Sequence, residues 1–171
     1  AAVESHARPG AAGEPFNYAA HLFETNASRA GKIAYIDDRG TLTYGELAQR
    51  SRRFAAALLA AGIRREERVL LVAHDTSEWP VAFLGAMYAG VVPVALNTLL
   101  TAADYAYVLG HSRARAAIVS APLVPVLSEA MALGPHELQA LVVIGDEAPA
   151  AVAGLPGGTH GFESFLGAAG P

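Results

Sequence analysis

The sequence contains no cysteine, few charged residues and no long uninterrupted run of apolar residues. The lack of cysteine excludes disulfides, thiol nucleophiles and thiolate metal sites, and it fits the cytoplasmic location that we expect. Charged residues make up 16% of the chain and hydrophobic residues 53%, an apolar balance for a globular domain. This balance predicts that part of the surface is covered by further protein, either the rest of a longer chain or a second copy in a homo-oligomer.

Charge and hydropathy also limit the class of partner. The net charge is −4 and the sequence contains no basic run, so we expect neither nucleic acid nor an anionic membrane as a partner. Pro, Gly, Asp or Arg interrupts each apolar stretch before it reaches the roughly 20 residues that a membrane span requires.

Several chemical motifs are also missing. The six histidines are scattered without a zinc-like spacing, so we expect no metal site in this chain. Neither a G-x-G-x-x-G fingerprint nor a G-x-x-x-x-G-K-[ST] loop occurs. The glycine-rich segment 154–159 contains no lysine, and we interpret it as a flexible connector.

Apolar runs of strand length alternate with segments of helical period, which predicts an α/β fold with a largely parallel sheet and flanking helices. A chain of 171 residues is long enough for one sizeable core. We expect a flexible lead-in at 1–15 and one α/β subdomain at 16–171. The expected helices are 17–28, 44–61, 77–89, 102–112, 122–133 and 162–166, and the expected strands are 33–37, 41–43, 69–73, 91–96, 116–120 and 141–145, with a loop at 146–161.

Local signals mark several of these boundaries. Thr43 and Glu46 fit a capping box at the start of the second helix. Leu47, Phe54, Ala55, Leu58 and Leu59 form its apolar face, and Gly62 ends it in the left-handed conformation. The segment 77–89 is apolar on all sides, which predicts a helix buried on several sides, followed by a stop at Gly90 and a buried strand.

In open α/β sheets, ligands bind beyond the carboxyl ends of the strands, so the residues that follow three expected strands are of interest. His74-Asp75-Thr76 follows the first, where Asp75 or Thr76 is expected to cap the next helix. Asn97-Thr98 follows the second, where the asparagine is expected to hold a loop. Ser120 ends the third and has no evident base beside it, so we interpret it as another helix cap.

Two sequence elements together resemble the adenylate-forming acyl-CoA synthetase family. Leu42-Thr43-Tyr44-Gly45-Glu46-Leu47 matches its LTYxEL element, and the segment from Leu84 to Asn97 matches its AxxxxGAVxVPxN element. Within that family, the segments 75–85 and 97–107 resemble the benzoate-CoA ligase group of aryl-CoA ligases. The resemblance extends from Phe16 to Leu166 and implies the N-terminal portion of such an enzyme.

The resemblance implies a two-step reaction in the parent enzyme, which uses ATP, Mg²⁺ and coenzyme A. An aromatic carboxylate such as benzoate attacks the α-phosphorus of ATP, and the thiol of coenzyme A then displaces AMP from the acyl-adenylate. The family holds the phosphates with a loop of outline Thr-Ser-Gly-Ser-Thr-Gly-x-Pro-Lys, and this sequence contains no such loop. We therefore assign no catalytic residue, name the remainder of the ligase as the partner, and expect the 171 residues alone to be inactive.

Asn97, Thr98 and Thr101 are the only site residues that the resemblance suggests, as a lining for the approach of coenzyme A. Some relatives carry an arginine two positions after the asparagine, where this chain has Leu99. Two other interpretations remain open. One is a free-standing, non-catalytic α/β interaction module derived from such an enzyme. The other is a small doubly wound nucleotide-binding domain, against which the missing phosphate motifs argue.

Overall fold

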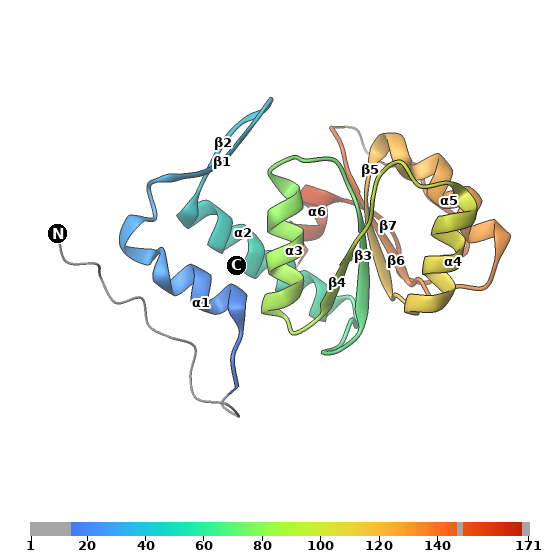
Figure 1. The fold of residues 1–171 in the computed structure, drawn as a ribbon, viewed down its shortest axis with the longest axis horizontal. Coiled ribbons are helices and arrows are strands. Elements are labelled where there is room, and N and C mark those ends of the chain that lie inside the picture. The colour runs from blue at the N-terminus through green and yellow to red at the C-terminus, as the bar shows by residue number, and fades with distance from the viewer. Residues whose placement is uncertain (1–14, 147–148, 169–171) are drawn as a thin grey trace.

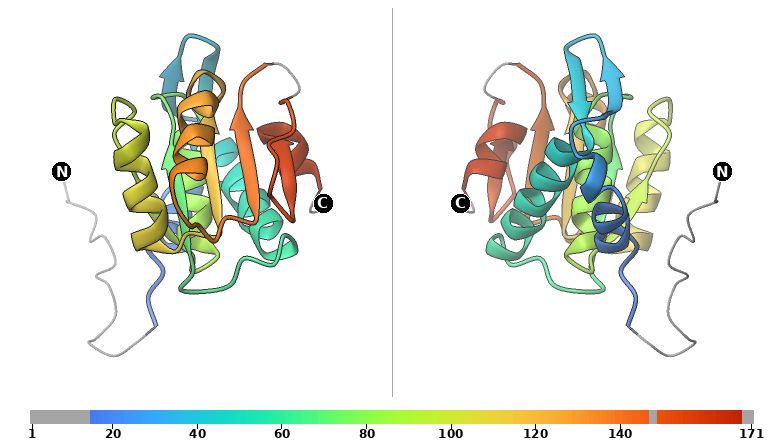
Figure 2. Two further views of the ribbon diagram at one scale, coloured as in Figure 1. Left: turned by 90° about the vertical axis from the view of Figure 1, so that its right-hand side faces the viewer. Right: turned by 90° about the vertical axis from the view of Figure 1, so that its left-hand side faces the viewer.

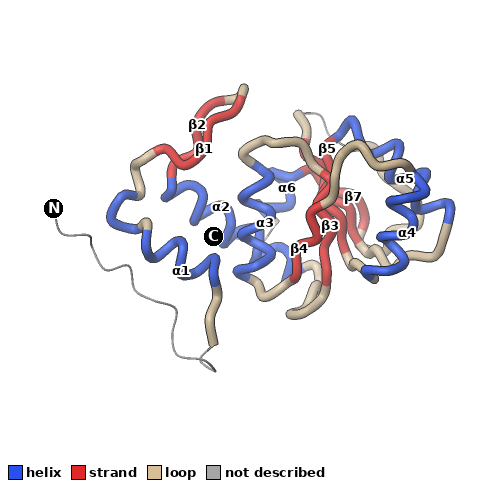
Figure 3. Tube along the Cα trace, in the orientation of Figure 1, coloured by secondary structure: helices blue, strands red, loops and turns tan. Residues whose placement is uncertain are grey.

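The computed structural model describes residues 15–146 and 149–168 (Figures 1 and 3). The expected lead-in at 1–15 lies, apart from Pro15, outside these residues. The helices are α1 (Tyr18–Thr25), α2 (Tyr44–Ala60), α3 (Glu78–Tyr88), α4 (Ala102–Ser112), α5 (Val124–Leu133) and α6 (Phe162–Gly167). The strands are β1 (Ile33–Asp37), β2 (Gly40–Thr43), β3 (Arg68–Val72), β4 (Val92–Ala95), β5 (Ala116–Ser120), β6 (Ala140–Ile144) and β7 (Gly158–Gly161).

The main sheet has five strands in the order β4-β3-β5-β6-β7, and each neighbouring pair is parallel. Strands β1 and β2 form a separate antiparallel hairpin, which projects from the body of the molecule (Figure 1). The predicted α/β fold with a largely parallel sheet is therefore confirmed.

Helices cover both faces of the sheet (Figures 1 and 2). Helices α2, α3 and α6 lie on one face, with α1 outside them, and α4 and α5 lie on the other. Each face has its own core: Phe54, Leu71 and Ile118 belong to the first, and Leu70, Tyr105 and Leu141 to the second. Helices of this chain therefore cover both faces of the sheet.

Large apolar side chains are exposed on the hairpin, the helices and the loops. Ile36 on β1 is 74% exposed, and Leu99, which precedes α4, is 88% exposed. The others are Phe16, Tyr18, Ile33, Tyr35, Leu59, Tyr88, Val92, Tyr107 and Leu133. Among them, Leu59 departs from the predicted apolar face of α2, because it lies beyond the stripe that faces α3 and the sheet.

Local sequence signals set the ends of α2 and α3 as predicted. The Thr43 hydroxyl accepts a hydrogen bond from the Glu46 amide at 3.3 Å, and the Glu46 carboxylate accepts one from the Thr43 amide at 2.8 Å. Gly62 and Gly90 follow the two helices with φ angles of 81° and 74°, which L-residues other than glycine rarely adopt.

Helix α3 is buried on several sides, as predicted, since it lies between α2, α1 and the sheet. The strand after it is shorter and more exposed than predicted, because β4 is the edge of the sheet. The Val92 and Leu96 amides donate toward β3, so the intervening Pro93, which has no amide proton, faces the free edge.

Three boundaries differ from the sequence-based expectation. Helix α1 ends at Thr25 and a 3₁₀ turn (Ala27–Arg29) follows it, and another 3₁₀ turn (Ala121–Leu123) precedes α5. The segment 146–161 is not all loop, because residues 158–161 form β7 against β6. A side chain at Gly157 would lie 3.0 Å from the Gln139 carbonyl oxygen, so glycine allows the close backbone approach that starts this strand.

In the described part of the chain, no helix is both long enough and apolar enough to cross a lipid bilayer.

Candidate functional site

The carboxyl ends of the parallel strands meet at one edge of the sheet, which we call the carboxyl edge. The chain leaves β3 toward β4 on one side and leaves β5 toward β6 on the other, so the connections diverge between β3 and β5. Ligands of open α/β sheets bind at such a divergence. The residues that follow β3, β4 and β5 therefore form the candidate site.

A cavity of about 350 Å³ lies at this edge, beside the ends of β3 and β4. We call it the carboxyl-edge cavity. Its lining residues are Ala73, His74, Asp75, Trp79, Ala95, Leu96, Asn97 and Thr98. Two of the three predicted site residues, Asn97 and Thr98, thus share one cavity with the residues that follow β3. Thr101 is not in its lining.

Asn97 holds its own loop, as predicted. Its side-chain oxygen accepts a hydrogen bond from the Leu99 amide at 2.9 Å. The backbone carbonyl of Asn97 accepts a second bond, at 2.7 Å, from the hydroxyl of the fully buried Tyr105. Burial raises the pKa of Tyr105 above its usual value, so this hydroxyl stays protonated as a donor at neutral pH.

Thr101 begins α4 with a second capping box. Its hydroxyl accepts a hydrogen bond from the Asp104 amide at 3.2 Å and lies 2.7 Å from the Asp104 carboxylate. The hydrogen bond from the Thr101 hydroxyl holds the pKa of Asp104 below its usual value. The Thr101 side chain therefore fixes the far end of the 97–101 loop.

Ser120 does not cap a helix, contrary to the sequence-based interpretation. Its buried hydroxyl oxygen accepts a hydrogen bond from the His74 amide at 3.0 Å. This bond joins the ends of β5 and β3, where the connections diverge. The 3₁₀ turn that follows Ser120 has no side-chain cap.

The predicted cap of α3 is also wrong, because neither Asp75 nor Thr76 provides it. The residue before α3 is Ser77, and its amide donates to the carboxylate of Asp37 in the hairpin at 2.7 Å. Hydrogen bonds from the Ser77 hydroxyl and amide, then from the Arg39 amide, lower the pKa of Asp37 to about 2. An anion at a helix N-terminus is electrostatically favourable.

The expected strands 33–37 and 41–43 place residues 38–40 in the connection between them, but they did not reveal the contact of this hairpin with the start of α3. An aspartate before such a turn was a visible signal for local hydrogen bonding. The Oδ2 atom of Asp37 accepts its hydrogen bond from the amide of Ser77, 40 positions later in the chain. No local sequence pattern reveals that pairing.

Trp79 lies in the first turn of α3. Its ring stacks on that of Phe83, with centroids 5.0 Å apart and planes inclined by 10°. The half-buried tryptophan also lines the carboxyl-edge cavity.

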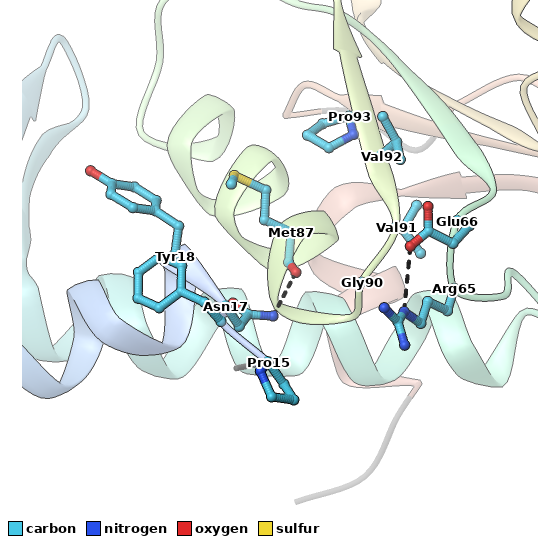
Figure 4. A pocket seen from close by; sticks show the side chains of 11 residues that line it. Pro15, Asn17, Tyr18, Arg65, Glu66, Met87, Gly90, Val91, Val92 and Pro93 are labelled. Atoms are coloured by element: carbon cyan, nitrogen blue, oxygen red, sulfur yellow. Dashed lines mark hydrogen bonds and ion pairs between the residues drawn. The ribbon is translucent and has the colours of Figure 1, made fainter. Parts of the chain in front are cut away.

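A larger cavity of about 590 Å³ lies beside α1 and the amino end of β4 (Figure 4). Most of its lining residues are apolar. Two of its polar lining residues bond to other residues of the lining. Asn17 donates to the Met87 carbonyl at 2.9 Å, and Arg65 pairs with its neighbour Glu66 at 3.5 Å. This cavity is at the opposite edge of the sheet from the candidate site.

Across residues 15–146 and 149–168, no group of three or more His, Cys, Asp or Glu side chains is placed to hold a metal ion. The carboxyl edge, as far as it is described, can form hydrogen bonds through its loop backbone and the side chains of Asn97, Thr98 and His74. The flat ring of Trp79 lies beside these groups.

The sequence pattern of the AMP-binding enzymes matches residues 22–158. The chain belongs to this family. The two sequence elements that resemble this family, residues 42–47 and 84–97, both lie within the matched range. Residues 42–47 form the end of β2 and the capped start of α2, and residues 84–97 form the end of α3, β4 and the start of the 97–101 loop.

Similar curated members of the AMP-binding family are CoA ligases. The chain is 43% identical over 155 residues to the benzoate–CoA ligase of Thauera aromatica, covering 88% of this chain and 29% of that protein. It is 43% identical over 137 residues to the 4-hydroxybenzoate–CoA/benzoate–CoA ligase of Rhodopseudomonas palustris, covering 79% of this chain and 25% of that protein.

Solved structures of the family agree with the fold. A benzoate CoA ligase from Burkholderia xenovorans LB400 superposes with a TM-score of 0.79 and 53% identity, over 92% of this chain and 29% of the other. The anthranilate CoA ligase AuaEII, solved with anthranoyl-AMP, gives a TM-score of 0.78 at 28% identity, over 90% of this chain and 28% of the other. The chain thus spans 25–29% of the length of these relatives.

Proposed function

We propose that the chain is the N-terminal α/β subdomain, residues 16–171, of an ATP-dependent aryl-CoA ligase. The whole enzyme would convert benzoate or a similar aromatic acid to its CoA thioester through an acyl-adenylate, with ATP, Mg²⁺ and coenzyme A. The observation that carries the proposal is the 53% identity to a benzoate CoA ligase over 92% of this chain.

The proposal gives this subdomain a supporting role. The sequence contains a single lysine, Lys32, and no Thr/Ser/Gly-rich loop that ends in lysine. The groups that stabilise the charge at the α-phosphorus during adenylyl transfer and on the departing pyrophosphate therefore come from the remainder of the ligase, which is the partner that we propose for this chain. The chain contributes a rigid sheet and the loops at its carboxyl edge.

We also propose that the 97–101 loop lies along the approach of coenzyme A. Asn97 and Thr98 line the carboxyl-edge cavity, and Thr101 fixes the end of the loop through its capping box. The exposed Leu99 in this loop offers an apolar surface rather than a cation. Recognition of phosphate by this loop would therefore rest on neutral hydrogen-bond donors.

The full-length protein that contains this chain provides the test. We expect exchange of pyrophosphate into ATP that depends on benzoate, and formation of a benzoyl thioester once coenzyme A is added. A series of hydroxy- and amino-substituted benzoates would then define the acid that is used. Purified full-length protein that shows no exchange with any aromatic acid of the series would contradict the proposed function.

A further inference from the structure

One wall of the carboxyl-edge cavity is the connection between β3 and α3, residues 73–77, which we call the β3–α3 loop. Ala73, His74 and Asp75 line the cavity and face the lining residues of the β4 end. Residues far away in the sequence hold both ends of the loop. The His74 amide donates to Ser120, and the Ser77 amide donates to Asp37.

Asp37 joins the hairpin to this loop with a single carboxylate. Its Oδ1 atom accepts hydrogen bonds from the Arg39 and Gly40 amides at 2.9 and 3.1 Å, which shape the turn between β1 and β2. Its Oδ2 atom accepts from the Ser77 amide at 2.7 Å. The same side chain therefore sets the hairpin turn and holds the end of the loop.

Arg39, in the same turn, makes two further contacts at the carboxyl edge. One guanidinium nitrogen lies 3.1 Å from the carboxylate of Glu78, the first residue of α3. The other lies 3.1 Å from the carboxylate of Asp146, which follows β6. A planar guanidinium can hold two carboxylates at once, which a lysine ammonium does less well.

The guanidinium of Arg39 is the positive charge that pairs with the carboxylate of Glu78. The Glu78 side chain is only 11% exposed, and its Oε2 atom has no hydrogen-bond partner within the described residues. A buried carboxylate without compensation is unfavourable. The Arg39 pair therefore favours the arrangement in which the hairpin tip, residues 37–40, lies against the start of α3.

The hairpin is not part of the main sheet, and two-stranded ribbons have little stability by themselves. Its base continues into α2. Side chains of its tip, Asp37 and Arg39, bond to Ser77 and Glu78 at the start of α3. This arrangement connects a surface hairpin with the cavity wall.

We propose that Asp37 and Arg39 are positioning residues, which set the β3–α3 loop and thereby the width of the carboxyl-edge cavity opposite Asn97 and Thr98. The inference rests on the proposed function, because it takes this cavity to lie on the route of coenzyme A. Asp37 and Arg39 themselves touch no substrate. Their effect reaches the reaction through residues 73–77.

The experiment uses the full-length ligase and compares Asp37→Ala and Arg39→Ala with the wild type. Two activities are measured: benzoate-dependent ATP–pyrophosphate exchange, which requires no coenzyme A, and thioester formation over a range of coenzyme A concentrations. We expect the KM for coenzyme A to rise by roughly fivefold or more, the usual lower size of coupling between distant sites. Exchange should stay close to the wild-type rate. A purely structural role would lower both activities together, and that result would overturn the proposal.

Arg53→Ala is the matched control, because Arg53 is an exposed arginine on α2 without an ion pair in the described part of the chain. It should leave both activities unchanged. If Arg39→Ala folds poorly, the double variant Arg39→Ala/Glu78→Gln removes the unpaired buried charge and should restore folding while the KM stays raised. Arg39→Lys, which can hold one carboxylate, should give an intermediate KM.

The two proposals fail differently. A wild-type protein without benzoate-dependent exchange contradicts the proposed function and the inference with it. A wild type that forms the thioester, with Asp37→Ala and Arg39→Ala showing the same KM for coenzyme A as Arg53→Ala, leaves the function intact and overturns the positioning role alone.

Discussion

Gly85 of α3 lies directly against the backbone of Ser51 in α2. A Cβ atom at Gly85 would be 2.7 Å from the Ser51 carbonyl oxygen and 2.9 Å from the Phe54 ring. Because a contact of this length with backbone cannot be relieved by rotating a side chain, the distance between α2 and α3 depends on glycine at this position.

Gly85→Ala should therefore destabilise the chain by about 1–3 kcal/mol, the usual cost of overpacking a core. Gly110→Ala is the matched control, since it is also in a helix and its Cβ would be no closer than 3.5 Å to the Pro135 carbonyl oxygen. That variant should be neutral or more stable by up to about 1 kcal/mol. Urea denaturation of both variants measures the difference, and equal stabilities would contradict the close packing.

Leu84→Asp should cost several kcal/mol, because Leu84 is 6% exposed and an unpaired carboxylate would enter an apolar site. Leu59→Asp on α2 makes the same change at a side chain that is 53% exposed, and it should alter stability little. Thermal melts followed by circular dichroism test both. A melting temperature of the Leu84 variant within a degree or two of the wild type would show that α3 is not buried.

Thr43→Ala removes a cap and should lower stability by about 1 kcal/mol. In the full-length enzyme the adenylation rate should remain nearly unchanged at a temperature where both proteins are folded. Thr41→Ala, in the same strand and exposed, controls for the loss of a threonine. A hundredfold loss of turnover in a well-folded Thr43 variant would indicate that its hydroxyl acts in the reaction.

Asp37 should make stability depend on pH in the acid range. Its pKa is about 2 in the folded chain, against about 3.9 for an unfolded aspartate, so the folded state favours the ionised form. The stabilisation is present above pH 4 and is lost as the pH falls through 2. Melting temperatures of wild type and Asp37→Asn should differ most at pH 5 and converge near pH 2. A difference that is constant across this range would contradict the assignment.

The 171-residue chain alone should not catalyse benzoate-dependent ATP–pyrophosphate exchange. Charge stabilisation by the missing phosphate loop is worth several orders of magnitude in rate for reactions of this kind. Exchange by the purified chain that is well above a buffer control, and that survives a second purification, would show that the described subdomain contains a catalytic centre of its own.

The sequence predicted those parts of the fold whose signals are local. The capping box at Thr43, the glycine stop at Gly90 and the loop hydrogen bond of Asn97 all involve atoms within a few residues of each other. Apolar runs bounded by such signals were sufficient to assign most strands and helices. Strand β7 was missed because Gly158-Thr159-His160-Gly161 has no apolar alternation and pairs only through its backbone.

The candidate site was predicted in part. The family resemblance suggested Asn97 and Thr98, which also follow an expected strand, and the structure places them in one cavity with His74 and Trp79. The bonds from Ser77 to Asp37 and from His74 to Ser120 span 40 and 46 positions. These pairings depend on the tertiary arrangement, so capping rules alone gave the wrong partner for both.

The aromatic contact between α2 and α6 has a consequence for biosynthesis. The ring of Phe54 packs on those of Phe162 and Phe165, each with a centroid distance of 5.6 Å. Translation proceeds from the N-terminus, so α2 emerges from the ribosome long before the residues that fill its groove. The core between the sheet and α4 and α5 uses no residue later than Leu155 among those described, whereas the core around Phe54 includes residues up to Leu166. The core that contains α2 is therefore completed last, and the Phe54 ring has no α6 partner until Phe162 and Phe165 have been made.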